Sequence, residues 1–397
     1  MVAPADRIPV SILTGFLGAG KSTLLNRLLK QPDMADAAVI INEFGEVGID
    51  HLLVEASDSV IELSNGCLCC TVRGELTDTL AGFHEAIQAG RMKRLSRVVI
   101  ETTGLADPAP VIQSIIGHPD LARIFSLDGV ITVVDAVNGV STLERHEEAR
   151  RQAALADRLI LSKKSLASEE TIADLVSRLR GLNPRAELID GDSARASAYD
   201  TFSAGLFDPR SRTADAARWL ADAAAHDDHD HVCDDHCDHD HHHHDDHDHH
   251  HHGDHGHHDH HHHHHGGHHH HHHDQAIRSF SITHDRPIDP AAIGMFVDLL
   301  RSAHAEKLLR MKAIVQLSDD PDRPLVLHGV QSVFHQPERL AAWPGDDRRT
   351  RMVLITQDLE EDFVRSLFDA FTGRPQVDRP DRQALEDNPL AIAGLRL

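Results

Sequence analysis

A nine-residue stretch near the N-terminus constrains the fold of this chain more than any other feature. Residues 15–22 of this stretch match the phosphate-binding pattern G-x-x-x-x-G-K-[ST] in full, and Thr23 follows them. Glycines let successive backbone N–H groups turn inward around phosphate oxygens, Lys21 is expected to neutralise the β- and γ-phosphates, and the Ser22 hydroxyl is expected to ligate Mg²⁺. The predicted nucleotide-binding residues are Gly15, Gly18, Ala19, Gly20, Lys21, Ser22 and Thr23. Lys21 is also a predicted catalytic residue.

The surroundings of this loop support the match. An apolar, β-branched run precedes the loop, and leucines at helical spacing follow it. Similar segments alternate along the chain as far as residue 189. The predicted strands are 8–14, 37–41, 59–63, 98–100, 129–134, 158–161 and 186–189, and the predicted helices are 22–30, 76–87, 109–116, 143–156 and 168–182. This alternation predicts an α/β domain with a mainly parallel, doubly wound sheet, whose ligand lies at the carboxyl ends of the strands.

The pattern changes in the C-terminal part of the chain. Strands are expected at 276–283, 308–317, 325–334 and 350–356, and helices at 290–302 and 359–372, which together indicate a smaller α+β domain. The predicted organisation is a P-loop domain at 1–191, a connector with a helical segment at 192–225, a His/Asp-rich tract at 226–274 and the C-terminal domain at 275–397.

The His/Asp-rich tract dominates the charge of the chain. It holds 29 of the 37 histidines and thirteen aspartates, without Lys or Arg, in a chain whose formal net charge is −24. Such a composition cannot bury enough apolar surface to offset its ordering entropy, so we expect disorder in the metal-free state and many weak metal sites. An acidic chain with only 4% aromatic residues lacks the features of a nucleic-acid binder. No leader or membrane-spanning run is evident, which predicts a cytoplasmic protein without membrane contact.

Acidic residues next to the phosphate loop are the next candidates. Glu101 ends a buried strand, where P-loop proteins place the acid that contacts Mg²⁺, so it is a predicted catalytic and magnesium-binding residue. Gly104 follows closely and can bring a backbone N–H to the γ-phosphate. Glu43 and Glu46 lie in a glycine-flanked segment suited to a change of order when the γ-phosphate is lost. Glu43 is therefore a third catalytic candidate, and the sequence does not decide whether either carboxylate positions the attacking water.

Three cysteines within four residues form a second sharp signal. Cys67, Cys69 and Cys70 are soft thiolate ligands that suit Zn²⁺ or Co²⁺, and they leave a tetrahedral site one ligand short, open to exchange. Packing cysteines or a redox pair are the alternatives. Among the isolated histidines, His118 is the one to test as an extra ligand.

Four motifs together resemble the CobW family of metal-handling P-loop GTPases. They are Leu13 to Thr23, Asn42-Glu43-Phe44-Gly45, Gly66-Cys67-Leu68-Cys69-Cys70 and Glu101 to Pro108, and Arg310 to Ala313 with His328-Gly329-Val330 resemble the family's C-terminal domain. The resemblance implies a GTPase that binds GTP, Mg²⁺ and a transition metal, Zn²⁺ or Co²⁺, and passes the metal to a client metalloprotein or a cobaltochelatase. It implies Cys67, Cys69 and Cys70 as metal ligands, with Glu43 as an additional one, and leaves a homodimer open.

One segment departs from the family pattern. Similar proteins read guanine with a T/N-K-x-D motif, and here Ser162-Lys163-Lys164-Ser165 stands in its place. Ser162 and Lys163 are the expected nucleotide-binding residues of this segment. Replacement of the guanine-binding aspartate by Ser165 predicts a weakened preference for GTP, because a lost bidentate base contact costs about 1–3 kcal/mol.

The sequence leaves three functions open. The first is a GTP-hydrolysing metallochaperone, which for Co²⁺ would serve cobalamin biosynthesis. The second is a passive His-rich metal store with an incidental P-loop domain. The third is a P-loop kinase for a small molecule, for which no substrate pocket or base is visible in the sequence.

Overall fold

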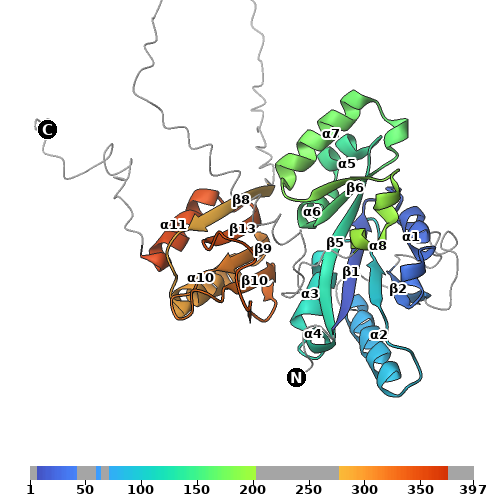
Figure 1. Cartoon of the computed structure of the whole chain (residues 1–397). Helices are drawn as coiled ribbons and strands as arrows, with labels where there is room; N and C mark the ends of the chain where they lie inside the picture. The colour runs from blue at the N-terminus through green and yellow to red at the C-terminus, as the bar shows by residue number, and fades with distance from the viewer. Residues whose placement is uncertain (1–6, 43–59, 64–70, 203–276, 374–397) are drawn as a thin grey trace, which may run out of the picture.

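The computed structural model describes residues 7–42, 60–63, 71–202 and 277–373. These residues form two domains that lie side by side, each with its own sheet (Figure 1). The predicted helix at 214–225 and the His/Asp-rich tract lie outside the described residues, so both stay predictions. The proposed domain boundaries likewise stay predictions.

The first domain is built on a seven-stranded sheet in which every neighbouring pair is parallel. The strand order is β3-β2-β4-β1-β5-β6-β7. The strands are β1 (Ile8–Gly15), β2 (Ala37–Asn42), β3 (Val60–Leu63), β4 (Arg97–Glu101), β5 (Phe125–Asp135), β6 (Arg158–Ser162) and β7 (Glu187–Asp190). All seven expected strands are present. They are parallel because a crossover segment brings the chain back between one strand and the next.

Helices cover both faces of this sheet, as the doubly wound prediction requires. The first face carries α1 (Lys21–Leu29), with the short segments η2 (Pro32–Met34), η5 (Ala194–Ser197) and α8 (Tyr199–Phe202) beside it. The second face carries α2 (Thr71–Gln88), α3 (Ala109–Gly117), α4 (Leu121–Ile124), α5 (Gly139–Arg145), α6 (Glu147–Leu155) and α7 (Glu169–Leu182). The remaining turn, η4 (Lys164–Leu166), follows β6.

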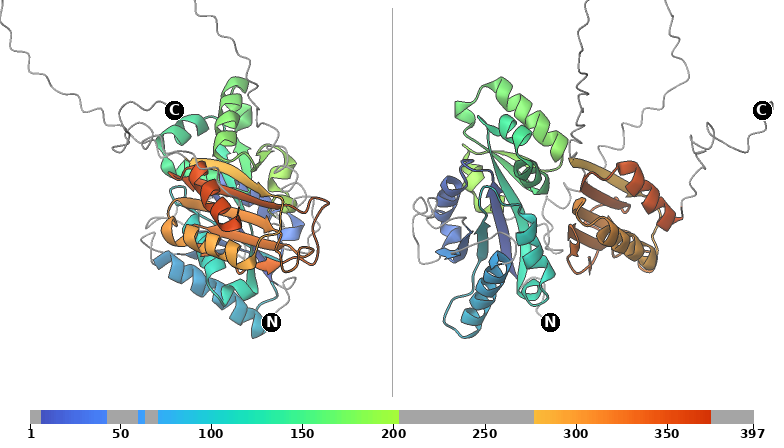
Figure 2. Two further views of the ribbon diagram at one scale, coloured as in Figure 1. Left: turned by 90° about the vertical axis from the view of Figure 1, so that its left-hand side faces the viewer. Right: turned by 180° about the vertical axis from the view of Figure 1, so that it is seen from behind.

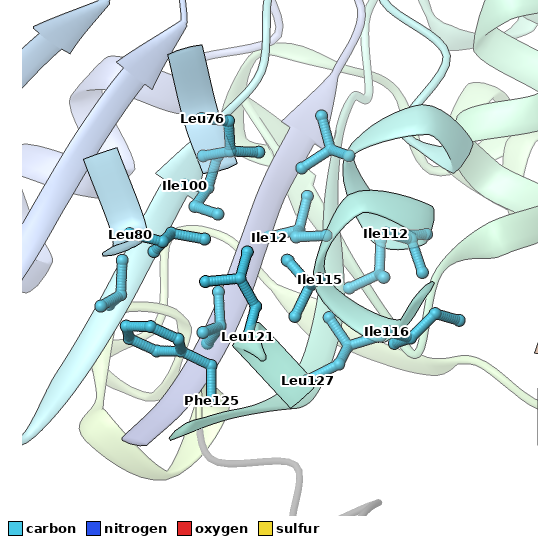
Figure 3. Packing of buried hydrophobic residues seen from close by; sticks show 14 of the residues in the cluster. Ile12, Leu76, Leu80, Ile100, Ile112, Ile115, Ile116, Leu121, Phe125 and Leu127 are labelled. Atoms are coloured by element: carbon cyan, nitrogen blue, oxygen red, sulfur yellow. The ribbon is translucent and has the colours of Figure 1, made fainter. Parts of the chain in front are cut away.

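Strand alternation sorts the core side chains between the two faces. On β1, Ile12 points into the cluster with α2 and α3, whereas its neighbour Leu13 belongs to the cluster with α1. Figure 3 shows the first of these clusters, in which Ile12 and Ile100 of adjacent strands meet Leu80 and Ile115 of the covering helices. Aliphatic side chains make up most of this core, and Phe83 and Phe125 are its aromatic members, which agrees with the low aromatic content of the sequence.

The second domain has an antiparallel sheet. Its order is β11-β10-β9-β13-β8, with β12 paired to β10. The strands are β8 (Ile277–His284), β9 (Leu308–Val315), β10 (Leu325–Val330), β11 (Val333–Phe334), β12 (Glu338–Arg339) and β13 (Thr350–Gln357). The helices α10 (Pro290–Ala303) and α11 (Glu361–Thr372) pack on one face of the sheet through apolar side chains, which confirms the expected α+β domain (Figure 2).

Two expected elements are divided in the structure. The single helix expected at 143–156 is two helices, α5 and α6, because His146 has extended backbone angles (φ −124°, ψ 117°). The strand expected at 325–334 is the β10–β11 hairpin, because Gln331 adopts a positive φ of 54° and reverses the chain. Both differences arise from backbone turns that periodicity alone does not reveal.

The chain that follows β7 packs on the first domain. Ala196 and Phe202 are both fully buried in the cluster around α1. The buried Arg97 fastens this segment, because its guanidinium donates to the Phe202 carbonyl and to the Ser11 hydroxyl and pairs with Asp128 at 2.6 Å. Residues 194–202, which follow β7, therefore pack on the first domain.

A buried ion cluster joins the two domains. Arg310 and Lys312 of β9 both reach Asp157, which lies between α6 and β6. The Arg310 guanidinium donates to both Asp157 oxygens at 2.8 Å, and the Lys312 ammonium lies 2.5 Å from Oδ1. Apolar contacts also join the two domains, since Leu309, Val330 and Ile355 of the second domain belong to the same core cluster as α3 of the first. Although burial raises the pKa of Asp157, the two cations hold that pKa well below its usual value.

We predict that Asp157→Ala destabilises the protein by about 3–5 kcal/mol, because it leaves two buried cations without their anion. The urea denaturation midpoint of the full chain measures this effect. Asp298→Ala is the matched control, since the Asp298–Arg301 pair is exposed and should change stability by less than about 1 kcal/mol. Equal midpoints for the two variants would contradict the prediction.

We also predict a pH effect at Lys312. Burial, together with the charge of Arg310, lowers the pKa of Lys312 from 10.5 to about 8. Between those pH values the unfolded chain binds more protons at Lys312 than the folded chain, so this group makes the fold more stable as the pH rises through that window. The free energy of unfolding of the unaltered chain, minus that of Lys312→Met, should therefore increase from about pH 8 to about pH 10.5. A flat or falling difference in urea midpoints would refute the assignment.

Candidate functional site

The phosphate loop lies where the sequence predicts it, between β1 and α1. Gly18 and Gly20 adopt positive φ angles of 71° and 97°, which turn the loop into the first turn of α1. Because a helix N-terminus presents unpaired N–H groups and a partial positive charge, this geometry suits a phosphate anion.

Lys21 lies inside the loop that precedes it. Its ammonium donates to the Gly15 carbonyl at 3.0 Å and approaches the Phe16 carbonyl at 3.5 Å, and the residue is only 5% exposed. The Lys21 ammonium is bound by carbonyls of its own loop, and phosphate oxygens of a bound nucleotide would compete with these carbonyls for it.

Sheet register brings Glu101 to the loop. Leu13 of β1 pairs with Glu101 of β4, and the Ser22 hydroxyl donates to the Glu101 carboxylate at 3.2 Å. Both side chains are buried, and oxygen ligands of this kind are the ones that Mg²⁺ prefers. The two residues therefore fit the magnesium site expected from the sequence.

Gly104 touches the phosphate loop directly. A Cβ atom at this position would lie 2.6 Å from the Leu17 backbone nitrogen, so only glycine permits the approach. The segment is held from α6, whose Gln152 amide donates to the carbonyls of Gly104 at 3.2 Å and Ala106 at 3.0 Å. Arg151 of α6 also binds Asp107 at 2.9 Å. Sequence reasoning missed Gln152 and Arg151, because nothing in a helical pattern marks which polar residue faces a loop 46 residues away.

Ser162 and Lys163 close the other side of the loop. The Ser162 hydroxyl donates to the Ala19 carbonyl at 2.6 Å, and the Lys163 ammonium donates to Gly18 O and to Asp135 Oδ2, both at 2.8 Å. Lys163 takes a left-handed conformation (φ 58°), which turns its side chain onto the loop. Although burial raises the pKa of Asp135, hydrogen bonds from Lys163 and Asn138 lower it overall. The sequence did not single out Asp135.

A cavity of about 260 Å³ adjoins the phosphate loop. Phe16 to Ala19 line it together with Asp135, Asn138, Gln152 and Lys163. The cavity thus connects the Gly104 side of the loop, through Gln152, with the Lys163 side.

The other predicted site residues divide into two groups. Glu43, Cys67, Cys69 and Cys70 lie outside the described residues, and no group of three His, Cys, Asp or Glu that could hold a metal ion occurs within them. His118 is described. It lies between α3 and α4, at the edge of the sheet opposite to the phosphate loop, and its Nδ1 accepts the Leu121 N–H at 3.4 Å.

A phosphate cradle at the carboxyl edge of a doubly wound parallel sheet, with a buried acid on the adjacent strand, defines the class of P-loop nucleotide-binding proteins. Residues 9–190 match the family model described as "CobW/HypB/UreG, nucleotide-binding domain", and residues 277–372 match "Cobalamin synthesis protein cobW C-terminal domain". The chain belongs to this CobW family and is a P-loop GTPase.

Relatives resemble the chain over nearly its full length. It is 29% identical to "Zinc chaperone YjiA" of Escherichia coli, with 91% of this chain and 98% of the relative covered. It is also 29% identical to "Zinc chaperone CobW" of a Sinorhizobium species, over 93% of this chain and 98% of the relative. Among solved structures, Zn(II)-bound YjiA GTPase from E. coli superimposes with a TM-score of 0.59 at 26% identity, over 92% of this chain and 99% of that one.

None of the helices that the structure describes is both long enough and apolar enough to cross a bilayer.

We predict that Glu101→Gln slows GTP hydrolysis about 10- to 100-fold, because the change removes the charge of the residue expected to hold the magnesium shell in place. Phosphate release measured over a range of Mg²⁺ concentrations tests this, and GTP binding without Mg²⁺ should not change. Glu170→Gln, on the exposed start of α7, is the control. Hydrolysis by Glu101→Gln at the normal rate at every Mg²⁺ concentration would refute the assigned role.

Proposed function

We propose that this GTPase is a metallochaperone that carries a transition metal, Zn²⁺ or Co²⁺, and releases it to a client metalloprotein under the control of the bound nucleotide. The names of the relatives favour Zn²⁺, since two of them are called zinc chaperones and a neighbouring structure contains Zn(II). Cobalt, with a cobaltochelatase as client, is the alternative that the thiolate chemistry also permits.

In this proposal Cys67, Cys69 and Cys70 hold the metal, with Glu43 as a further ligand. The observation that supports it is the register of the parallel sheet. Asn42, which precedes the Glu43 segment, pairs with Leu63, which precedes the cysteine segment, and Ile41 pairs with Glu101. Neighbouring strands lie about 4.8 Å apart, so the strand ends that lead into these segments are only about 5–10 Å from the strand that carries Glu101.

The residues of the phosphate site would act as follows during hydrolysis. Lys21 and the N-terminus of α1 would hold the phosphate oxygens, and Ser22 and Glu101 would hold Mg²⁺, which when bound neutralises charge on the β- and γ-phosphates. The Gly104 backbone N–H would bind the γ-phosphate. Glu43 is the proposed residue that orients the attacking water.

Nucleotide control requires a coupling between the two sites. If GTP orders the Glu43 and cysteine segments, metal affinity rises, and hydrolysis or client docking lowers it again. Linkage then requires that the metal change GTP affinity by the same factor, typically about 5- to 150-fold.

We predict that the Zn²⁺ affinity of the full chain, measured by competition with a chromophoric chelator, rises about 5- to 150-fold with a non-hydrolysable GTP analogue and Mg²⁺. Cys69→Ser should abolish this tight site, whereas Cys233→Ser, in the His/Asp-rich tract, should leave it intact. Repeating the titration with Co²⁺ separates the two metals.

Deletion of residues 226–274 separates the chaperone from a passive store. A tight, nucleotide-sensitive site that survives the deletion supports the chaperone. Loss of most binding on deletion, with the same affinity in the presence and absence of nucleotide, would refute it in favour of a store.

A further inference from the structure

Recognition of guanine poses a chemical problem in this chain. The guanine edge presents two donors, N1–H and the N2 amino group, and a carboxylate can accept both at once, which adenine cannot exploit. Ser165, which follows the loop-binding Lys163, offers a single hydroxyl oxygen. A preference for GTP therefore needs an acceptor from another part of the fold.

The geometry of the phosphate loop locates the base. Gly104, whose backbone is expected to contact the γ-phosphate, lies against Leu17, and α1 begins at the other end of the loop. The nucleoside must therefore extend past Gly18 to Gly20, toward the segments that follow β6 and β7. Ser162 and Lys163 already touch this part of the loop, through the carbonyls of Ala19 and Gly18.

Asp192 brings a carboxylate to this place. Its Oδ2 accepts the Ser165 backbone N–H at 3.2 Å. The Asp192 carboxylate therefore lies next to position 165, where the family motif has an aspartate and this chain has a serine. Asp192 is exposed, and its sequence distance from Ser165 is 27 residues. Sequence reading around Ser165 could not reveal it.

The segment that carries Asp192 is held rigidly. The Arg27 guanidinium of α1 donates to the carbonyls on both sides, Gly191 O at 2.7 Å and Ser193 O at 2.9 Å. The Gly191 N–H bonds to Leu161 O at 2.8 Å, so closely that a Cβ atom on Gly191 would lie 2.6 Å from that oxygen. These contacts tie the end of β7 to α1 and to β6, and therefore to the phosphate loop.

Other carboxylates near the loop are already engaged. Asp135 binds the Lys163 ammonium and the Asn138 amide. Asp190 binds the Lys164 ammonium at 2.7 Å and the Asp192 N–H at 2.9 Å. Asp192, in contrast, uses one oxygen for Ser165, and its other oxygen has no hydrogen-bond partner within the described part of the chain.

We infer that Asp192 is the residue that selects guanine in this GTPase, with its carboxylate accepting the N1–H and N2 amino hydrogens in place of a side chain at position 165. Asp192 is thus a specificity-determining residue for the nucleotide. This role depends on the GTPase class of the chain and not on the proposed metal cargo.

The test is an exchange of base preference in Asp192→Asn. An amide still accepts N1–H but repels the guanine amino group with its own N–H donors, whereas xanthine carries an acceptor oxygen at that position. Competition of GTP, XTP and ATP against a fluorescent GTP analogue on the full chain should show GTP binding weakened about 5- to 150-fold, XTP binding strengthened and ATP binding unchanged. A misfolded variant could not gain affinity for XTP.

Two further variants complete the design. Asp200 is an exposed aspartate in α8, and the control variant Asp200→Asn should leave all three affinities unchanged. Ser165→Asp added to Asp192→Asn should restore the preference for GTP. The inference is overturned if Asp192→Asn keeps the GTP preference of the unaltered chain, or if the unaltered chain binds ATP as tightly as GTP. Neither outcome bears on nucleotide-dependent metal binding, which the chelator titrations measure separately.

Discussion

The parallel pairing of β1 with β4 and β5 is the constraint on which the nucleotide site depends. Pairing of Leu13 with Glu101, and of Gly15 with Val133, aligns the carboxyl ends of the three strands at one edge. The phosphate loop, the Glu101–Gly104 segment and the Asp135 turn therefore leave the sheet together. A shift of one residue in this register would exchange the two faces of the strand and move Glu101 away from Ser22.

Helix α6 links this edge to the second domain. Its Gln152 amide binds the carbonyls of the Gly104 segment, and the Leu155 carbonyl at its end accepts a hydrogen bond from Arg310. At its start, Glu147 accepts a hydrogen bond from Gln357 at 2.9 Å. The segment expected to follow the γ-phosphate and the sheet of the second domain thus contact the same helix. The contacts of Arg310 and Glu147 each involve a charged group, and hydrogen bonds of that kind are stronger than neutral ones.

Much of the fold could be predicted because its signals are local. Ile8 to Thr14, the phosphate loop and the leucines of α1 form one continuous pattern, and Ser168 caps α7 where the sequence predicts a helix start. The predictions were wrong where a single backbone angle decides the outcome, as at His146 and Gln331. They also missed the packed segment at Ala196 and Phe202, since short apolar stretches between polar residues carry no periodicity.

By itself, the sequence determined the class of this protein, because the phosphate loop, Glu101 and Gly104 are recognisable from spacings of a few residues. Only the tertiary structure decided which distant side chains complete these motifs. Asp192 meets Ser165, Gln152 meets Gly104 and Asp157 meets Arg310 across separations of 27, 48 and 153 residues. Such contacts depend on strand order and on the way the two domains pack. The residues adjacent to a motif predict neither property.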